Sequence, residues 1–283
     1  MKFGPLDTED AVGTLLAHSV VLPGGGLKKG HRLSKADIEA LIKTGHSEII
    51  VAQLEPGDVE ENDAAARLAE LLRSDLVEAE PAFTGRANLY AKQTGIFEVN
   101  ADLVGALNRI DPAITLATLA HDTFVEAGRM VATVKIIPLA VSGSALATAE
   151  MVLIGDAALM LTQSRPYRVG LIATQLPTLK PATMDKTARI LSERLGKAGS
   201  TLNEEQRVDH TAEAVASALE DMKDKHDLLV VFGASAITDR LDVIPAGIEH
   251  AGGVVHSFGM PVDPGNLLLT GSVGDVPVIG APG

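Results

Sequence analysis

Two carboxylates follow an apolar run and a glycine in the stretch VVFGASAITDRLD (230–242). Asp239 and Asp242 could act as catalytic groups, and Asp242 could be a ligand of Mg²⁺, because this ion prefers carboxylate oxygens. Such an ion would neutralise charge on a transferred phosphoryl group. Small residues next to the strand would let the backbone approach a ligand closely: Gly233, Ala234 and Ser235. The helix that follows favours an anion at its start, so the stretch predicts a phosphate-tolerant loop.

The same residues also have simple structural explanations. Asp is a preferred helix N-cap, so Asp242 can serve only to start the next helix, and Asp239 can be a solvated side chain. Ser235 has no histidine or lysine at a recognisable spacing, which argues against a serine nucleophile. The eight histidines form neither an HExxH motif nor another close ligand pair. Residue types and spacing therefore predict a pocket with carboxylates and no particular reaction.

Further loops are expected beside this one at the carboxyl ends of strands. Ligands of open α/β sheets bind there because the loops converge and helix N-termini point at the crevice. The loops are TQLPTLKP (174–181), MPVDPGN (260–266) and GAPG (280–283). Pro261, Pro264 and Gly265 would hold the backbone of the second loop rigid against the same crevice.

An alternation of strands and helices from residue 167 onward would position these loops. The apolar runs typical of parallel strands covered on both faces are YRVGLIAT (167–174) and DLLVVF (227–232). The amphipathic helices are expected at 184–197, at 210–222 and in VIPAGIEHAG, which ends at Gly252 and Gly253. Strands separated by such helices predict an α/β domain over 167–283, with an open, mostly parallel, three-layer sheet.

The first 166 residues lack this alternation and are expected to form a mixed α+β region. Helices are predicted in SKADIEALIKTG (34–45), from about Asp58 to Leu72, and from Asn100 onward. The glycine-rich LPGGGLKKGHRL before the first helix is a hairpin candidate. Strand-like segments follow at 114–119 and 129–141. The polar, proline-containing SRPY (164–167) predicts the boundary between domains 1–166 and 167–283.

Composition excludes several classes of function. Lys and Arg number 24 against 37 Asp and Glu, and this net charge of −13 would repel a nucleic-acid backbone. There is no cysteine, which excludes disulfides and a cysteine nucleophile and fits a reducing cytoplasm. Pro138, Glu150 and Asp156 interrupt the most apolar stretch (135–161), which predicts buried core rather than a membrane span. We expect a cytoplasmic protein without nucleic-acid or membrane partners.

The order of the loop motifs in 167–283 resembles that of the molybdopterin-binding domains of molybdenum cofactor biosynthesis proteins. That family has a Gly-Gly-x-Ser or Gly-Gly-Thr-Gly loop after a strand, an Asp that opens a helix, an E-x-x-G, a K-P-G-x-P loop and a closing G-L-P-G-N-P. The counterparts here are FGASAITDRLDVIP, IEHAGG, MPVDPGN and VPVIGAPG. The N-terminal segment AVGTLLAHSVVLPGGGLKKGHRLSKADIEALIKTGHSEIIV is similar to the opening of the molybdate-insertion proteins.

The resemblance implies that 167–283 binds molybdopterin or the molybdenum cofactor. Backbone N–H groups from Gly233 to Ser235 would hold the terminal phosphate or the pterin edge. Asp242, together with Asp239, would hydrogen-bond pterin N–H groups or position a Mg²⁺. The implied cofactor-binding residues are Thr174, Gly233, Ala234, Ser235, Asp242, Pro264, Gly265, Asn266, Gly280 and Pro282.

Three departures from the family pattern change the charges around this pocket. The family's T-G-D-E is Thr174-Gln175-Leu176-Pro177 here, so two acids are missing. Phe232-Gly233 replaces Gly-Gly, and two additional residues precede Asp242. Asn266 follows Gly265 where molybdate-insertion loops carry a lysine. These changes predict that the pocket shape is kept and that its chemistry is altered or lost.

The arrangement is similar to the N-terminal half of bacterial proteins that fuse a molybdopterin-binding domain to a cytidylyltransferase-like domain. The chain ends directly after a strand without the helix that usually covers such a sheet edge, so we expect a nucleotidyltransferase-like domain beyond it. Two alternatives remain. Asp239 and Asp242 would support Mg-dependent nucleotidyl transfer or molybdate insertion within this chain, with a nucleotide as second ligand. Otherwise residues 1–166 would form a non-catalytic homo-oligomerisation or docking module.

Overall fold

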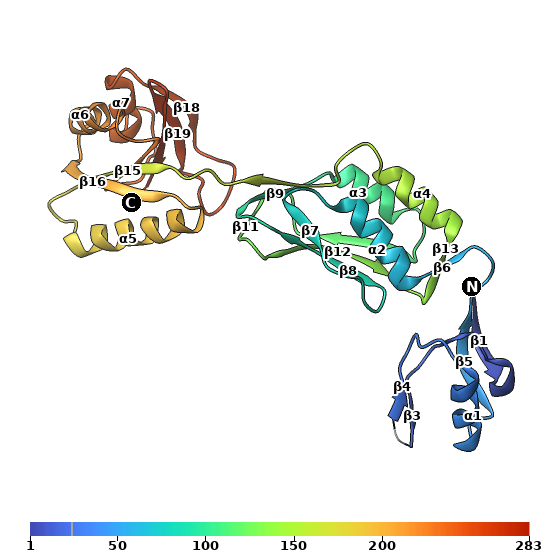
Figure 1. Ribbon diagram of the computed structural model, residues 1–283. Coiled ribbons are helices and arrows are strands. Elements are labelled where there is room, and N and C mark those ends of the chain that lie inside the picture. Colours follow the sequence, from blue (N-terminus) through green and yellow to red (C-terminus); the bar gives the residue numbers. More distant parts are fainter. Residues whose placement is uncertain (24, 283) are drawn as a thin grey trace. The chain divides into compact units, whose positions relative to one another are not determined.

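The computed structural model describes residues 1–23 and 25–282. The chain forms two compact units, Met1–Gln163 and Ser164–Gly283, and both combine helices with strands (Figure 1). The predicted mixed α/β class is therefore confirmed. The assignment of distinct functions to 1–166 and 167–283 stays a prediction.

A six-stranded sheet forms the centre of the described second unit, in the order β16-β15-β17-β20-β19-β18. The strands are β15 (Arg168–Gln175), β16 (Thr201–Asp209), β17 (Leu228–Phe232), β18 (Val254–Phe258), β19 (Leu269–Val273) and β20 (Val276–Ala281). Strands β16, β15, β17 and β20 run parallel. Strand β19 runs antiparallel to both β20 and β18, so the sheet is open and mostly parallel.

Helices cover both faces of this sheet. They are α5 (Pro181–Lys197), α6 (Ala212–Met222) and α7 (Val243–His250). Successive side chains of a strand point to opposite faces. Val169 and Leu171 of β15 therefore pack with Ala188 of α5, whereas Ile172 packs with Val215 of α6. Figure 1 shows α5 on one side of the strands and α6 with α7 on the other, which gives three layers.

Two strands of this sheet differ from the expectations. The sequence pattern predicts no strand between 184–197 and 210–222, yet β16 lies there at the sheet edge. Its residues, TLNEEQRVD, alternate between exposed and half-buried positions and contain no apolar run that would indicate a strand. The last strand, β20, pairs with β17 on one side and β19 on the other. The expectation of an uncovered sheet edge after the last strand was therefore wrong, and that argument for a further domain fails.

The first unit contains small sheets with the orders β1-β5-β2, β10-β12-β8-β7, β11-β9-β14, β13-β6 and β3-β4. The strands are β1 (Lys2–Asp7), β2 (Leu15–Leu16), β3 (Val20–Leu22), β4 (Gly25–Leu27), β5 (Glu48–Gln53), β6 (Asp58–Glu60), β7 (Val77–Ala79), β8 (Arg86–Ala91), β9 (Gly95–Val99), β10 (Ile114–Thr118), β11 (Thr123–Val125), β12 (Met130–Ile136), β13 (Ala140–Ser142) and β14 (Leu159–Gln163). The helices are η1 (Thr8–Asp10), α1 (Lys35–Lys43), α2 (Glu61–Leu72), α3 (Ala101–Asn108) and α4 (Gly143–Leu153).

Separate hydrophobic clusters hold the parts of the first unit together. One joins α1 to the first sheet through Leu41 and Val51, and another joins α2 and α4 to β8 through Leu68, Leu146 and Leu89. Strand β6 occupies residues that we predicted to begin the second helix, because 58–60 pair with β13. The apolar stretch 135–161 is divided among β12, β13, α4 and β14, and none of the described helices is long and apolar enough to cross a membrane.

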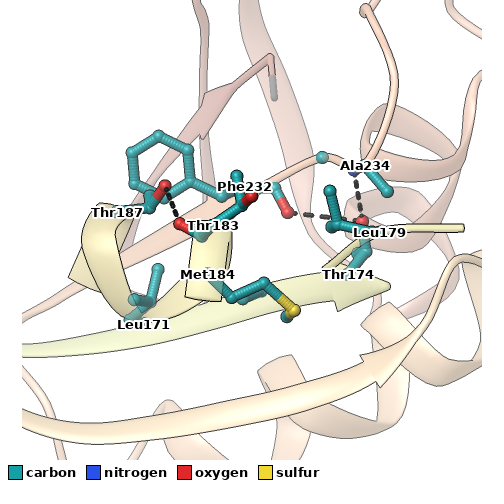
Figure 2. Close-up of a pocket in the computed structure, with 10 residues that line it drawn as sticks. Leu171, Thr174, Leu179, Thr183, Met184, Thr187, Phe232 and Ala234 are labelled. Atoms are coloured by element: carbon teal, nitrogen blue, oxygen red, sulfur yellow. Dashed lines mark hydrogen bonds between the residues drawn. The ribbon is translucent and has the colours of Figure 1, made fainter. Parts of the chain in front are cut away.

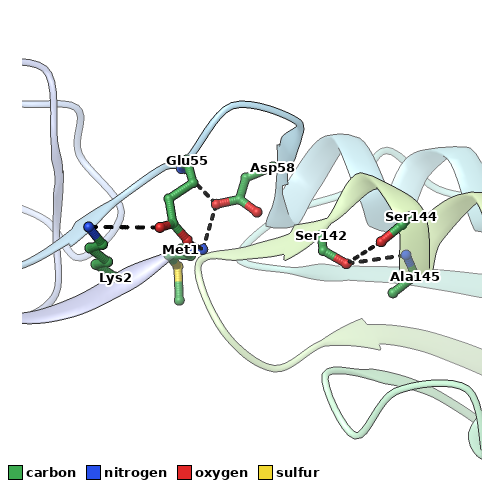
Figure 3. Close-up of polar contacts among 7 residues, drawn as sticks. All are labelled: Met1, Lys2, Glu55, Asp58, Ser142, Ser144 and Ala145. Carbon is green, nitrogen blue, oxygen red and sulfur yellow. Dashed lines mark hydrogen bonds and ion pairs between the residues drawn. The ribbon is translucent and has the colours of Figure 1, made fainter.

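Ion pairs and caps fix several element ends in the first unit (Figure 3). The amino group of Met1 lies 2.7 Å from both Glu55 Oε2 and Asp58 Oδ2. This ammonium and the N–H of Glu55 lower the pKa of Asp58. Ser142 Oγ accepts a hydrogen bond from the N–H of Ala145 and so caps α4. These contacts tie β1 to the β5–β6 connection and set the start of α4.

Close packing of α6 against α7 predicts a stability difference between two glycine substitutions. A Cβ on Gly247 would lie 2.6 Å from Val215 Cγ1 and 3.2 Å from the carbonyl oxygen of Ala212, whereas one on Gly196 of α5 would meet no atom within 4 Å. We expect Gly247→Ala to destabilise the protein by about 1–3 kcal/mol through overpacking. Gly196→Ala should stabilise it by about 0.5–1 kcal/mol, because alanine favours helix. Urea unfolding measures both, and equal effects of the two variants would contradict this packing.

The capping box of α1 predicts a pH-dependent contribution to stability. Asp37 Oδ2 accepts hydrogen bonds from the N–H and hydroxyl of Ser34 and lies 2.9 Å from His31 Nε2. The Ser34 hydroxyl and then His31 lower the pKa of Asp37 to about 2. A lowered folded-state pKa adds stability that is complete above about pH 4 and is lost as the pH falls toward 2. Ser34→Ala should cost about 1 kcal/mol at neutral pH.

Urea midpoints of Asp37→Asn and wild type should therefore differ at pH 5 and converge only as the pH falls toward 2. Glu39→Gln, an exposed change on the same helix, is the matched control and should leave both midpoints unchanged. A difference between Asp37→Asn and wild type that stays constant with pH would show that the carboxylate is not the source.

Candidate functional site

Strand direction brings the predicted loops to one edge of the second unit's sheet. The loops that leave the carboxyl ends of the parallel strands are 176–180 after β15, 233–242 after β17 and Pro282 after β20. Strands β18 and β19 are antiparallel, so the loop between them, 259–268, lies at the same edge. The last residue of the predicted GAPG loop, 283, is outside the described residues. This is the edge at which ligands of open α/β sheets bind.

A chain of hydrogen bonds links three neighbouring strand ends at this edge. Thr174 Oγ1 accepts a hydrogen bond from the N–H of Ala234 at 2.7 Å. The same oxygen lies 2.8 Å from His210 Nδ1 and 3.3 Å from the carbonyl oxygen of Phe232. The other ring nitrogen, His210 Nε2, lies 2.9 Å from Ser235 Oγ. Figure 2 shows Phe232 and Ala234 beside the hydroxyl of Thr174.

The contact between His210 and Ser235 corrects the sequence analysis, which found no partner for this serine. The two residues are 25 positions apart in the chain. His210 directly follows β16, Ser235 lies just beyond β17, and both strands pair with β15. Because β16 was not predicted, its end gave no signal for this site. Thr174, predicted to bind the cofactor, is only 1% exposed, and its hydroxyl accepts a hydrogen bond from the loop N–H of Ala234.

Some of the backbone N–H groups expected to hold a phosphate are already used. The N–H of Gly233 donates to the carbonyl oxygen of Ala281 at 2.9 Å, and that of Ala234 donates to Thr174. In the part of the chain that the structure describes, the N–H groups of Ser235, Ala236 and Ile237 have no hydrogen-bond partner. Ser235 and Ala236 are exposed. The donors available to an anion therefore begin at Ser235, at the end of the predicted segment, and extend beyond it.

Both predicted catalytic acids bond to their own loop. Asp242 occupies the N-cap position of α7 but makes no side-chain cap to that helix. Its Oδ2 instead accepts hydrogen bonds from the N–H groups of Thr238 at 2.5 Å and Asp239 at 2.9 Å, and from the Thr238 hydroxyl at 3.1 Å. The two N–H groups lower the pKa of Asp242. Asp239 Oδ1 accepts from the N–H of Leu241 at 2.8 Å, so these carboxylates hold the loop's shape.

The carboxylates of Asp239 and Asp242 offer few free oxygens to a Mg²⁺ ion. No group of three or more His, Asp or Glu side chains among the described residues could hold a metal ion. Asp242 Oδ2 is also occupied by three donors. Mg²⁺ is usually held by one or two carboxylates together with water and substrate phosphates, and of these two carboxylates only Asp242 Oδ1 and Asp239 Oδ2 have no bonded donor among the described residues. We therefore derive no metal-dependent step from Asp239 or Asp242.

The remaining predicted residues fall into two groups. Pro264, Gly265 and Asn266 are exposed in the loop at the site edge, where the N–H of Met260 donates to the carbonyl oxygen of Asn266 at 3.0 Å. Gly280 is buried within β20, where a Cβ would lie 3.0 Å from side-chain atoms of Ile244 and Leu269. Pro282 follows β20 and is half-buried. Gly280 therefore serves packing, whereas the 264–266 segment is open to a ligand.

A small apolar cavity lies between β15 and α5 (Figure 2). Its volume is about 90 Å³, and its lining includes Leu171, Met184, Phe232, Gly233 and Ala234. Liquid water occupies about 30 Å³ per molecule, so the cavity holds a group of only a few heavy atoms. Binding pockets for larger ligands measure about 300–1,000 Å³. A large ligand must therefore lie across the exposed loops rather than inside this cavity.

Two cationic side chains belong to the loops of this edge. Lys180 occupies the N-cap position of α5. Arg240 belongs to the 233–242 loop, and its guanidinium lies 5.8 Å from the centroid of the Phe258 ring. Contact with an aromatic face holds a guanidinium in place. The edge thus carries two cations, of which Arg240 is held by Phe258, beside the carboxylates of Asp239, Asp242 and Asp263.

The bonds of Asp242 predict that its removal loosens the loop. In Asp242→Ala the N–H groups of Thr238 and Asp239 lose their acceptor, and their hydrogen exchange should accelerate roughly tenfold. Because the pKa of Asp242 is lowered in the folded protein, the wild-type protection should persist above about pH 4 and fall below it. Asp221→Ala, an exposed change on α6, is the matched control. Unchanged exchange at both amides in Asp242→Ala would contradict the assigned bonds.

Comparison with known proteins gives weak similarities. The family model described as a domain of unknown function (DUF8806) matches residues 5–53. A search of curated proteins gave no match. A molybdopterin biosynthesis MoeA protein from Pyrococcus horikosii is 14% identical with a TM-score of 0.34, and the alignment covers 100% of this chain and 70% of that one. Molybdenum cofactor biosynthesis protein B is 19% identical with a TM-score of 0.34, over 43% of this chain and 83% of that one.

The CinA protein of unknown function from Thermoplasma acidophilum is 17% identical with a TM-score of 0.34, and the alignment covers 41% of this chain and 88% of that one. Alignments with scores this low decide nothing about function.

Proposed function

We propose that the second unit binds a phosphorylated pterin, molybdopterin or the molybdenum cofactor, at the carboxyl edge of its sheet. The observation that carries the proposal is the run of N–H groups from Ser235 to Ile237. These groups have no partner among the described residues and begin on an exposed loop at this edge. Unpaired backbone donors are costly unless water or a ligand satisfies them, and successive N–H groups suit a phosphate. The order of the loop motifs supports a pterin as the rest of the ligand.

Different residues at the edge would contact different parts of the ligand. The N–H groups of Ser235 and Ala236 would donate hydrogen bonds to the phosphate, and Lys180 and Arg240 would attract its charge. The exposed 264–266 segment would contact the pterin body across the edge. Thr174 contributes indirectly, because its hydroxyl holds the N–H of Ala234 and so fixes the loop. A ligand bound in this way lies over the loops, as the small volume of the cavity requires.

A binding role is better supported than nucleotidyl transfer or molybdate insertion by this chain. Those reactions move phosphoryl or oxyanion charge and depend on carboxylate-held Mg²⁺. Asp239 and Asp242 are instead engaged with backbone N–H groups of their own loop. A nucleotide partner, a further nucleotidyltransferase-like domain and homo-oligomerisation through residues 1–166 stay predictions from the sequence.

A charge placed beside the free N–H groups should weaken binding. Ala236→Asp puts a carboxylate at the expected phosphate position, so its affinity for molybdopterin should fall about tenfold or more through like-charge repulsion. Ser192→Asp adds the same charge to an exposed position toward the other end of α5 and should change affinity by less than about twofold. Isothermal titration calorimetry with the full chain measures both affinities.

Inorganic phosphate and a pterin without phosphate separate the two parts of the ligand. Phosphate alone should shift the amide NMR signals of Ser235 to Ile237, and the unphosphorylated pterin should bind more weakly than molybdopterin. Absence of heat with molybdopterin, together with unshifted amide signals, would remove the proposal. If Ala236→Asp and Ser192→Asp weaken molybdopterin binding equally, the ligand does not bind at this loop.

A further inference from the structure

Ser235 has the contacts that activate a hydroxyl group for attack. Its Oγ lies 2.9 Å from His210 Nε2, and the opposite ring nitrogen, Nδ1, lies 2.8 Å from Thr174 Oγ1. A nucleophile, a base within hydrogen-bond reach and a third group that orients the base are the parts of a nucleophilic site. We propose that Ser235 is a nucleophile toward short-chain carboxylic esters, with His210 as general base and Thr174 as the positioning residue. This activity goes beyond the proposed pterin binding and does not rest on it.

The hydrogen bonds of Thr174 can hold His210 in the tautomer that the reaction requires. A threonine hydroxyl has one hydrogen and can accept two hydrogen bonds. When His210 Nδ1–H and the N–H of Ala234 donate to Thr174 Oγ1, its own hydrogen points to the carbonyl oxygen of Phe232 at 3.3 Å. His210 Nε2 then carries no hydrogen and accepts one from Ser235. Thr174 thus takes the orienting role that a carboxylate has in Ser-His-Asp sites.

Donors for the developing negative charge lie directly after the nucleophile. The N–H groups of Ala236 and Ile237 have no partner within the described part of the chain. The N–H of the residue after the nucleophile is the usual oxyanion donor in hydrolases that carry the serine on a turn after a strand. Such donors stabilise the oxyanion of a tetrahedral intermediate. The loop therefore carries a second set of groups that ester chemistry needs.

The reaction requires no metal and no redox partner. Ser235 Oγ bonds to the carbonyl carbon of the ester while its proton passes to His210 Nε2. The bond from that carbon to the alcohol oxygen then breaks, and the leaving alcohol takes the proton from Nε2. Water then attacks the acyl carbon and gives a proton to His210 Nε2. The bond from that carbon to Ser235 Oγ breaks, Oγ takes the proton from Nε2, and the acid is released. Ser235 is exposed and lies outside the lining of the small cavity, so its hydroxyl is open to a short-chain ester from solvent.

The same unit contains a natural control for this arrangement. His256 Nε2 lies 3.0 Å from Ser272 Oγ, close to the separation in the proposed site. These residues lie on the paired strands β18 and β19. Among the described residues no group is within hydrogen-bond reach of His256 Nδ1. The His256–Ser272 pair thus matches the His210–Ser235 pair in distance. Among the described residues it has no positioning residue and no loop with free N–H groups.

Labelling of the full chain with a fluorophosphonate tests the nucleophile without any pterin. Attack by an activated serine forms a P–O bond and releases fluoride, and peptide mass spectrometry locates the label. We expect the label on Ser235 and not on Ser272, and release of 4-nitrophenol from 4-nitrophenyl acetate at the same site. Ser235→Ala should abolish both signals, and His210→Gln should slow both at least about 100-fold. Ser272→Ala and His256→Gln should change neither rate by more than about twofold.

Thr174 is tested by a pair of variants and by a spectroscopic readout. Thr174→Val keeps the shape but removes the hydroxyl, so labelling should slow about tenfold or more, and Thr174→Ser should restore it. The ¹⁵N NMR signals of His210 should show the hydrogen on Nδ1. Circular dichroism and thermal unfolding establish that each variant is folded. An unlabelled Ser235, wild-type labelling in His210→Gln, or a hydrogen on Nε2 overturns the proposal. Failure of pterin binding leaves these outcomes unaffected.

Discussion

Parallel pairing of β15 with β16 on one side and β17 on the other is the constraint on which the candidate site depends. Parallel neighbours end at the same edge, so the residues just beyond their carboxyl ends meet although they are far apart in sequence. Thr174 near the end of β15, His210 after β16 and Ser235 after β17 are brought together in this way. The buried residues of β15 and the helices that cover both faces hold these strand ends in register.

The buried hydroxyl of Thr174 fixes the 233–242 loop relative to the strands of the sheet. It joins the N–H of Ala234, the ring of His210 and the carbonyl oxygen of Phe232. Asp242 provides a second anchor, because its carboxylate binds the N–H groups of Thr238 and Asp239. The segment between the anchors, Ser235 to Ile237, keeps its N–H groups free among the described residues, and the side chains of Ser235 and Ala236 are exposed. The proposed pterin binding and the proposed ester chemistry would both use this segment, the first through its N–H groups and the second also through the hydroxyl of Ser235.

Several features of the second unit could be predicted from local sequence. Apolar runs indicated β15 and β17, and apolar spacing indicated the three helices, because burial on both faces of a sheet or on one side of a helix leaves such patterns. Strand β16 left no such pattern, since an edge strand exposes much of its surface and can carry charged residues. The central place of β20 also could not be read from the sequence, because strand order depends on pairing between distant segments.

The sequence by itself determined which residue types occupy the loops: two acids, a serine two residues after a glycine, and leucine and proline where the similar family pattern has two further acids. It also determined the mixed α/β class through its periodicity. Only the tertiary structure decided what these residues do. It bonded Asp242 to its own loop and left the N–H groups of Ser235, Ala236 and Ile237 without partners among the described residues. It also placed His210 between Thr174 and Ser235. The physical reason is that hydrogen-bond partners are chosen by distance in space, which the order of residues along one chain does not specify.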